Sequence, residues 1–144
     1  MIKIICVGKI KEKFYREAIE EYLKRLSKYH KINIIEVNDS NPKLEASEIL
    51  KKIDSKDYIV TLEIEGKQLS SLELSNFIDK TFLNYSNITF IIGGSEGLDQ
   101  EIKSKANYKL SFSNLTFPHQ LFRVILLEQI YRSFKILNNE TYHK

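Results

Sequence analysis

A short apolar run, Ile88 to Ile92, ends abruptly in a cluster of glycines at Gly93, Gly94 and Gly97. The chain of 144 residues contains only 5 glycines, so this cluster marks a local requirement. The apolar run predicts a buried strand, and glycines directly behind it predict a turn whose backbone closely approaches another group. In open α/β sheets, ligands bind at the carboxyl ends of the strands. Two interpretations follow, a cofactor-binding loop and a purely structural turn.

The known phosphate-binding patterns do not fit this cluster. The dinucleotide pattern G-x-G-x-x-G would need a glycine at Ile92 and an acidic residue about 20 positions further on, where Phe112 to Phe117 has no carboxylate. The phosphate loop G-x-x-x-x-G-K-[ST] is absent from the chain. A loop for a triphosphate is therefore not favoured.

Strand-like apolar runs alternate with segments of helical periodicity along the whole chain. This alternation predicts a single-domain α/β fold over residues 1–144, with a mostly parallel sheet and helices on both faces. Asn41 followed by Pro42, and Ser70 followed by Glu73, are typical of helix starts. The expected strands are 1–8, 31–37, 57–64, 88–92 and 108–112, with a turn at 65–67; the expected helices are 11–29, 42–53, 71–83, 99–106 and a final one that includes 121–127.

The final helix is apolar on all sides from Leu121 to Leu127, apart from Arg123. A helix that covers a sheet needs only one apolar stripe, so this one requires a second cover. A second copy of the chain in a twofold dimer is the interpretation we favour, and burial within the monomer is the alternative.

Composition and charge limit the function classes. The 22 Lys and Arg against 19 Asp and Glu give a net charge of +3, which alone does not indicate a nucleic-acid partner. Lys9, Lys11 and Lys13 form a small basic cluster that is either a solvated face or an RNA contact. The single cysteine, Cys6, is expected to be a buried thiol in a reducing cytoplasm, and no segment has the length of a membrane span or the pattern of a signal peptide.

A second loop, Phe112 to His119, follows the next expected strand and carries neutral hydrogen-bonding groups among apolar residues. Such a loop suits an adenine or a thioether better than a triphosphate. With the third strand ending in Thr61 to Ile64, three neighbouring strand ends are expected to form one pocket.

Four motifs in order resemble the ribosomal RNA large subunit methyltransferase H family, and the likeness extends over the whole chain. They are Thr61-Leu-Glu-Ile-Glu-Gly-Lys67, Phe90-Ile-Ile-Gly-Gly-Ser-Glu-Gly-Leu98, Leu115-Thr-Phe-Pro-His-Gln-Leu-Phe-Arg-Val124 and Asn139-Glu-Thr-Tyr-His-Lys144. The resemblance implies an S-adenosylmethionine-dependent methyltransferase of the SPOUT class, a homodimer with a carboxyl-terminal trefoil knot. It further implies methylation of N3 of a pseudouridine in 23S ribosomal RNA on the assembled ribosome, without a metal or a membrane.

Carried over by position, the resemblance also implies a set of site residues. The cofactor-binding residues would be Leu62, Gly93, Phe112, Ser113, Asn114, Leu115, Thr116 and Phe117, and the catalytic residues would be His119, Arg123, Tyr142 and His143. The tail with Tyr142 and His143 would lie by the active site, either its own or that of the partner subunit.

The chemistry of two of these residues can be argued directly. The imide N3 is a poor nucleophile until it loses its proton, so a base or a cation is required. His119, at an expected helix start, would be kept neutral by the helix dipole and able to accept a proton; the alternative is a surface histidine that caps the helix. Arg123 needs an anionic partner if buried, either a substrate or phosphate anion or a structural carboxylate such as Glu128.

The chain departs from the family pattern in two places. Thr141 stands where many relatives have proline, which would make the tail less rigid, and the region between Val37 and Leu44 is short. Two other functions stay open at this point: a related methyltransferase acting on transfer RNA, and a ribosome-associated module without catalysis.

Overall fold

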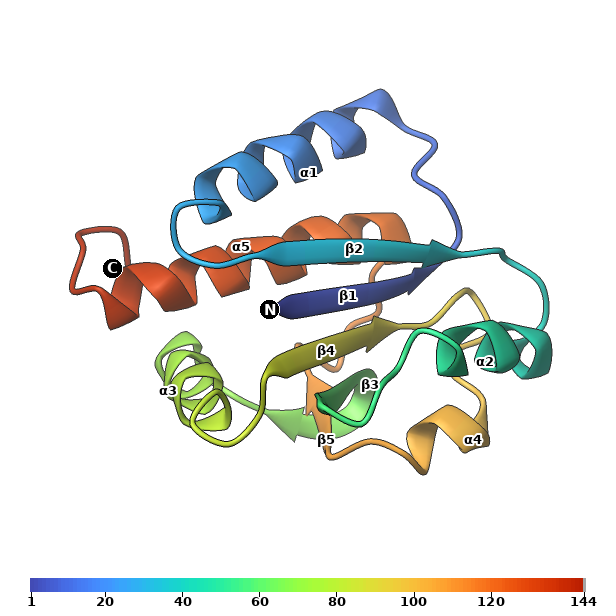
Figure 1. Ribbon diagram of the computed structural model, residues 1–144. Helices are drawn as coiled ribbons and strands as arrows, with labels where there is room; N and C mark the ends of the chain where they lie inside the picture. Colours follow the sequence, from blue (N-terminus) through green and yellow to red (C-terminus); the bar gives the residue numbers. More distant parts are fainter. Residues whose placement is uncertain (144) are drawn as a thin grey trace.

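The computed structural model describes residues 1–143, and Lys144 lies outside the described residues. Strands and helices alternate from the first residues to the last helix (Figure 1). The strands are β1 (Ile2–Val7), β2 (Ile32–Val37), β3 (Asp57–Gln68), β4 (Asn87–Ile92) and β5 (Tyr108–Ser111); the helices are α1 (Lys13–Leu26), α2 (Pro42–Leu50), α3 (Ser71–Thr81), α4 (Gln100–Lys103) and α5 (His119–Leu137).

The strands form one sheet in the order β2-β1-β4-β3-β5, and every neighbouring pair is parallel. β1 and β4 lie at the centre, with Ile4 opposite Phe90, and their apolar runs are buried because helices cover both faces. The predicted α/β class with a parallel sheet is confirmed. The trefoil knot stays a prediction.

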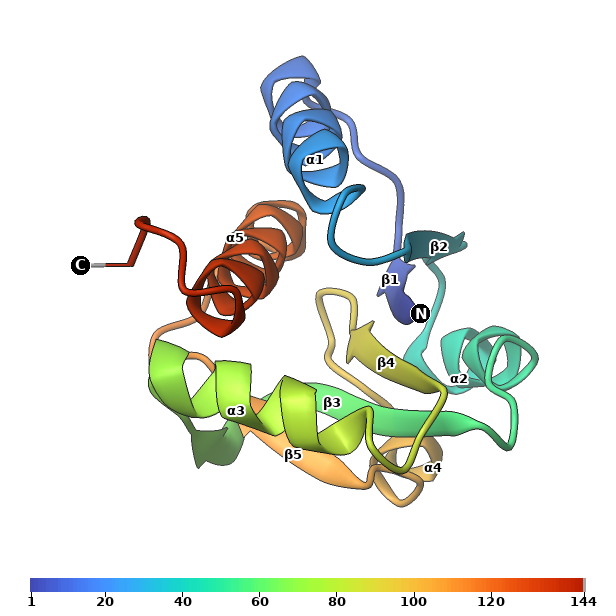
Figure 2. The ribbon, with the colours of Figure 1, turned by 60° about the vertical axis from the view of Figure 1, so that its left-hand side comes forward.

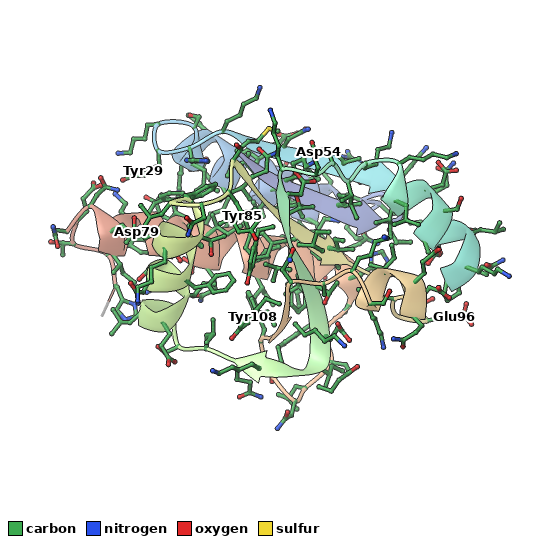
Figure 3. The ribbon with its side chains drawn as sticks, turned by 60° about the horizontal axis from the view of Figure 1, so that its bottom comes forward. Tyr29, Asp54, Asp79, Tyr85, Glu96 and Tyr108 are labelled. Carbon is green, nitrogen blue, oxygen red and sulfur yellow. The ribbon has the colours of Figure 1, made fainter. Side chains whose placement is uncertain are left out.

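The helices form two unequal layers (Figure 2). α1, α5 and α3 cover one face over the larger hydrophobic cluster, and α2 and α4 cover the other face over a smaller one. An aromatic cluster joins α3 and the loop after it to the sheet: the ring of Tyr85 lies 5.0 Å from that of Tyr58, and the ring of Tyr108 lies 4.8 Å from that of Phe77. Tyr85 and Tyr108 are labelled in Figure 3.

The helix-start signals in the sequence are present as side-chain caps. The Asn41 side chain accepts a hydrogen bond from the Leu44 amide at 3.0 Å. Ser70 and Glu73 form the reciprocal capping box, with bonds of 2.8 and 3.0 Å between each backbone amide and the other side chain. The predicted helix starts near 42 and 71 are therefore confirmed, whereas α2 and α4 end earlier than expected.

The predicted turn at 65–67 is wrong, because β3 continues through it to Gln68. Leu62 and Lys67 both lie opposite Leu110 of β5, so the intervening residues bulge out of the ladder and pairing then resumes. A Cβ on Gly66 would lie 2.7 Å from the Lys109 carbonyl oxygen, which explains the glycine as a close backbone approach.

α5 lies between α1 and α3 along the sheet (Figure 2). Every residue from His119 to Leu137 is buried or half-buried, so much of its apolar surface is already covered within one chain. Leu121, Val124 and Ile125 on this helix are half-buried, and Val124 packs against the larger hydrophobic cluster. Within residues 1–143, no helix is long and apolar enough to cross a membrane.

Candidate active site

A cleft of about 450 Å³ opens at the carboxyl ends of β4 and β5 and beside the bulge of β3 at residues 62–65. These strands are neighbours in the order β4-β3-β5, as the three strand ends singled out in the sequence require. Its volume lies in the usual range for small-molecule sites. The three expected segments do line one pocket, although β3 does not end at its segment and continues to Gln68.

The glycine loop forms one wall of the cleft through Gly93, Gly94 and Gly97. The Gly97 amide donates to the Gly94 carbonyl at 3.0 Å, and Gly97 has φ of +79°, which strongly favours glycine. A Cβ on Gly93 would lie 2.9 Å from the Gly97 carbonyl carbon. The cluster is thus a tight turn that also forms a wall of the cleft; the structural turn is confirmed, and the cofactor-binding role stays a prediction.

The loop after β5 forms a second wall and is held by its own serines. The Ser111 hydroxyl donates to the Ser113 carbonyl at 3.1 Å, and the Leu115 amide donates to the Ser113 hydroxyl at 2.9 Å. Asn114 does not line the cleft, because its side-chain oxygen accepts a hydrogen bond from Gln68 at 3.2 Å. The other seven of the eight expected cofactor residues line it: Leu62, Gly93, Phe112, Ser113, Leu115, Thr116 and Phe117.

Three phenylalanines give the cleft an aromatic side. The ring centroid of Phe122 on α5 lies 5.0 Å from that of Phe112 and 6.0 Å from that of Phe117. Flat apolar rings beside a polar backbone suit a neutral heteroaromatic ring such as adenine. Phe122 belongs to the sequence motif around His119 but carries no assigned role there.

Four ionisable residues line the cleft: Glu63, Glu65, Lys103 and His119. The first three received no role from the sequence. Glu63 had a usable signal, since it directly follows Leu62 at a strand end. Lys103 had none, because nothing in a short polar helix indicates that it lies beside β3.

His119 is the first residue of α5 and lies against the turn after β1. A Cβ on Gly8, which has φ of +91°, would come within 3.2 Å of the imidazole Cε1. Burial, followed by the nearby Arg123 cation, lowers the pKa of His119 below its ordinary value of 6.5. The ring is therefore neutral near pH 7, as expected, although burial is the leading cause. Its side chain does not cap the helix.

Arg123 lies one turn further along α5, almost wholly buried, and does not line the cleft. Its Nη1 donates to Glu36 at 2.5 Å, and its Nη2 donates to the Gly8 carbonyl at 2.7 Å. The anionic partner is thus a carboxylate of β2, which is the structural alternative with Glu36 in place of Glu128. Arg123 fixes the turn against which His119 packs.

Tyr142 and His143 lie near the other end of α5. The Tyr142 hydroxyl donates to Glu128 at 2.5 Å, and the His143 Nδ1 lies 3.2 Å from the Arg132 guanidinium. The bond to Glu128, together with burial, raises the pKa of Tyr142 to about 12. From His119 to Glu128 the helix rises roughly 14 Å. Within one chain, Tyr142 and His143 therefore lie away from the cleft and do not line it.

Among residues 1–143, no group of three or more His, Cys, Asp or Glu side chains is arranged to hold a metal ion. The cleft instead offers backbone groups, aromatic rings and one neutral imidazole.

Comparison with known proteins places this fold and cleft in a family. Residues 1–143 match the family described as "Predicted SPOUT methyltransferase". The chain is 54% identical to ribosomal RNA large subunit methyltransferase H of Clostridium botulinum (strain Loch Maree / Type A3) and 51% identical to that of Clostridium tetani (strain Massachusetts / E88). In both cases the match covers 99% of each chain.

Solved structures agree on the fold at much lower identity. A probable methylase family protein from Haemophilus influenzae Rd KW20 aligns with a TM-score of 0.58 at 15% identity, over 99% of this chain and 70% of that one. The SpoU methyltransferase AviRb from Streptomyces viridochromogenes, solved with the cofactor AdoMet, aligns with a TM-score of 0.51 at 8% identity, over 96% of this chain and 58% of that one.

The full-length likeness to these enzymes, on a parallel sheet whose strand ends form the expected cleft, leads to one assignment. The chain belongs to the ribosomal RNA large subunit methyltransferase H family of SPOUT methyltransferases.

Proposed function

We propose that this protein uses S-adenosylmethionine to methylate N3 of a pseudouridine in 23S ribosomal RNA on the assembled ribosome. One observation carries the proposal: the cleft at the ends of β4 and β5 and the bulge of β3 gathers seven of the eight residues that the family resemblance assigns to the cofactor. Membership of a methyltransferase family supplies the reaction class.

The cleft fits the proposed cofactor. The aromatic rings of Phe112, Phe117 and Phe122 offer an apolar surface for adenine, and the backbone of residues 112–117 offers donors and acceptors to its edge. The backbone of Gly97 lies so close to Gly93 that Gly93 has no room for a side chain. When bound, S-adenosylmethionine supplies an electrophilic methyl group on its sulfonium.

His119 is the group we propose to accept the N3 proton. It lines the cleft, and its lowered pKa keeps the ring unprotonated near pH 7. Arg123 acts through the turn at Gly8, which it holds in place by its bond to the Gly8 carbonyl. In this proposal, Arg123 positions the base and does not need to touch the RNA.

The proposed unit is a homodimer of one SPOUT domain per chain, working in the cytoplasm. Leu121, Val124 and Ile125 of α5 are apolar and only half-buried, so they leave apolar surface for a second copy. A twofold partner also offers a route for Tyr142 and His143 to reach a cleft, which they do not reach in their own chain. Sedimentation at micromolar concentration tests the dimer, and a monomer would refute it.

Transfer of radioactive methyl groups tests the reaction. Assembled ribosomes, isolated 23S ribosomal RNA and transfer RNA are incubated separately with labelled cofactor, and nuclease digestion with mass spectrometry identifies the product nucleoside. We expect 3-methylpseudouridine from ribosomes only. Label confined to transfer RNA would refute the substrate, and RNA binding without any label would indicate a non-catalytic module.

A further inference from the structure

We propose that Glu63 binds the ribose diol of the cofactor and thereby makes the cleft selective for ribonucleoside ligands. This inference rests on the proposed function, because it takes the ligand to be an S-adenosyl compound. Glu63 is the one carboxylate that both lines the cleft and is buried, its side chain being 4% exposed.

The fold positions this carboxylate in two steps. Glu63 is the first residue of the β3 bulge, directly after the last regular pair of that strand with β5 at Leu62. Its Oε2 then accepts a hydrogen bond from the buried hydroxyl of Thr61 at 2.6 Å. The carboxylate is therefore held in one orientation before any ligand binds.

This carboxylate retains free acceptor capacity. An ionised carboxylate has about four acceptor positions, and Thr61 uses one of them. The Lys103 ammonium lies 3.7 Å from Oε1, beyond hydrogen-bond distance, and is shared with Glu65 at 3.4 Å. Burying such a group is costly unless its oxygens find donors, so a bound ligand with two adjacent donors would match it.

An S-adenosyl ligand has four groups that attract a carboxylate: the adenine amino group, the ribose diol, the sulfonium and the α-ammonium of the methionine part. The α-ammonium lies at the end of a flexible chain beside its own carboxylate, whereas the diol is held on a rigid ring next to the adenine, so we assign the diol to Glu63. Adenine presents a donor beside an acceptor, and backbone amides and carbonyls of residues 112–117 would complement that edge without a charge. The sulfonium is a poor choice, because its positive charge disappears during methyl transfer, so a carboxylate beside it would stabilise the reactant more than the transition state. Two vicinal hydroxyls are two donors whose charge does not change in the reaction.

The test compares ligands with and without the diol on the same protein. Calorimetry measures the Kd of S-adenosylhomocysteine and of its 2′-deoxy and 3′-deoxy analogues for the wild type and for Glu63→Gln. We expect the wild type to bind the parent compound about tenfold or more tightly than each deoxy analogue, since a bond to a charged acceptor is lost. In Glu63→Gln this ratio should fall to about twofold. A loss of folded protein affects the parent compound and the deoxy analogues equally, so it does not change the ratio of their Kd values.

Glu65→Gln is the matched control, because it removes the other partner of Lys103 from the same strand. It should keep the wild-type ratio. An unchanged ratio in Glu63→Gln, or an equal fall in Glu65→Gln, would overturn the assignment of the diol to Glu63 while leaving the methyltransferase proposal intact. Failure of the wild-type protein to bind S-adenosylhomocysteine would overturn both, so the two failures are distinguishable.

Discussion

Arg123 on α5 forms an ion pair with Glu36 on β2, although the two residues are 87 positions apart in the chain. The Arg123 side chain is 2% exposed and that of Glu36 is 38% exposed, so the pair reaches from the interior to the surface. Through the Gly8 carbonyl the same guanidinium also holds the turn after β1. The start of α5, the edge strand and this turn therefore form one connected unit.

Removing Arg123 should affect both stability and turnover. We expect Arg123→Ala to lower the free energy of unfolding by about 3 kcal/mol, because Glu36 and the Gly8 carbonyl lose their partner. Turnover should fall more than affinity for S-adenosylhomocysteine, since Arg123 does not line the cleft. Urea denaturation, methyl-transfer kinetics and calorimetry measure the three quantities.

Glu36→Gln separates a positioning role for Arg123 from a direct catalytic one. If Arg123 acts by holding the Gly8 turn, this variant should lose part of the turnover although Glu36 is remote from the cleft lining. Full turnover in Glu36→Gln combined with complete loss in Arg123→Lys would show that the guanidinium contacts the substrate instead.

The pKa of His119 predicts a dependence on pH. Because the folded-state pKa lies below the ordinary value of 6.5, the unfolded chain binds more protons between these two values. The stabilisation is complete above about pH 6.5 and is lost as the pH falls towards the folded-state pKa. The free energy of unfolding of His119→Gln should therefore fall less on acidification than that of the wild type. His30→Gln is the comparison variant. Burial also lowers the pKa of His30, so the free energy of unfolding of this variant should likewise fall less on acidification than that of the wild type.

The same shift should appear in the reaction. If His119 is the base, the acid limb of the kcat/KM profile should have its midpoint below pH 6.5. His119→Gln should remove that limb and lower kcat by about a hundredfold or more. An unaltered limb in this variant would assign the base to another group.

Gly93→Ala should weaken cofactor binding, although it adds only a methyl group. The new Cβ would lie 2.9 Å from the Gly97 carbonyl carbon, so the turn must move. Overpacking of this kind costs about 1–3 kcal/mol, which corresponds to roughly tenfold to a hundredfold in Kd for S-adenosylhomocysteine. Glu96→Gln, at an exposed position of the same loop that does not line the cleft, should bind normally. Equal Kd values for the two variants would contradict this account.

Mixing two inactive variants tests where the tail acts. Within one chain Tyr142 contacts Glu128, well away from the cleft, so we expect it to serve the partner subunit. Random pairing of Tyr142→Ala with His119→Ala chains should then restore about a quarter of the wild-type sites. A tail that served its own chain would restore none.

The sequence predicts local structure well where the signal is local. Asn41 and the pair Ser70 and Glu73 mark helix starts through bonds that span only three residues, and both are found. The prediction of a turn at 65–67 was wrong because a glycine can mark either a turn or a close approach of two backbones. Gly66 is the second case, since it lies against the backbone of Lys109 on β5. Pairing with a distant strand leaves no local signal.

The site was predictable for a similar reason. The glycine cluster and the family resemblance together pointed to Gly93 and Leu62, and both line the cleft, whereas the side chain of Asn114 bonds to Gln68 instead; their role in binding the cofactor stays a prediction. The partner of Arg123 was not predictable. The sequence alone does not show whether Arg123 pairs with a carboxylate close to it in the chain, such as Glu128, or with a distant one, such as Glu36. Lys103 likewise depends on how α4 packs beside β3.

Leu62 and Lys67 both lie opposite Leu110, so the register between β3 and β5 does not depend on the residues that bulge out between them and line the cleft. Residues 63–65 bulge out of the ladder, so their side chains can change while the strands on either side keep their partners; Gly66 cannot, because a Cβ there would lie 2.7 Å from the Lys109 carbonyl oxygen. Ligand preference and folding are thus under separate control in this segment. The side chains of the bulge can therefore be substituted in the way that loop residues are, even though the segment is part of a strand.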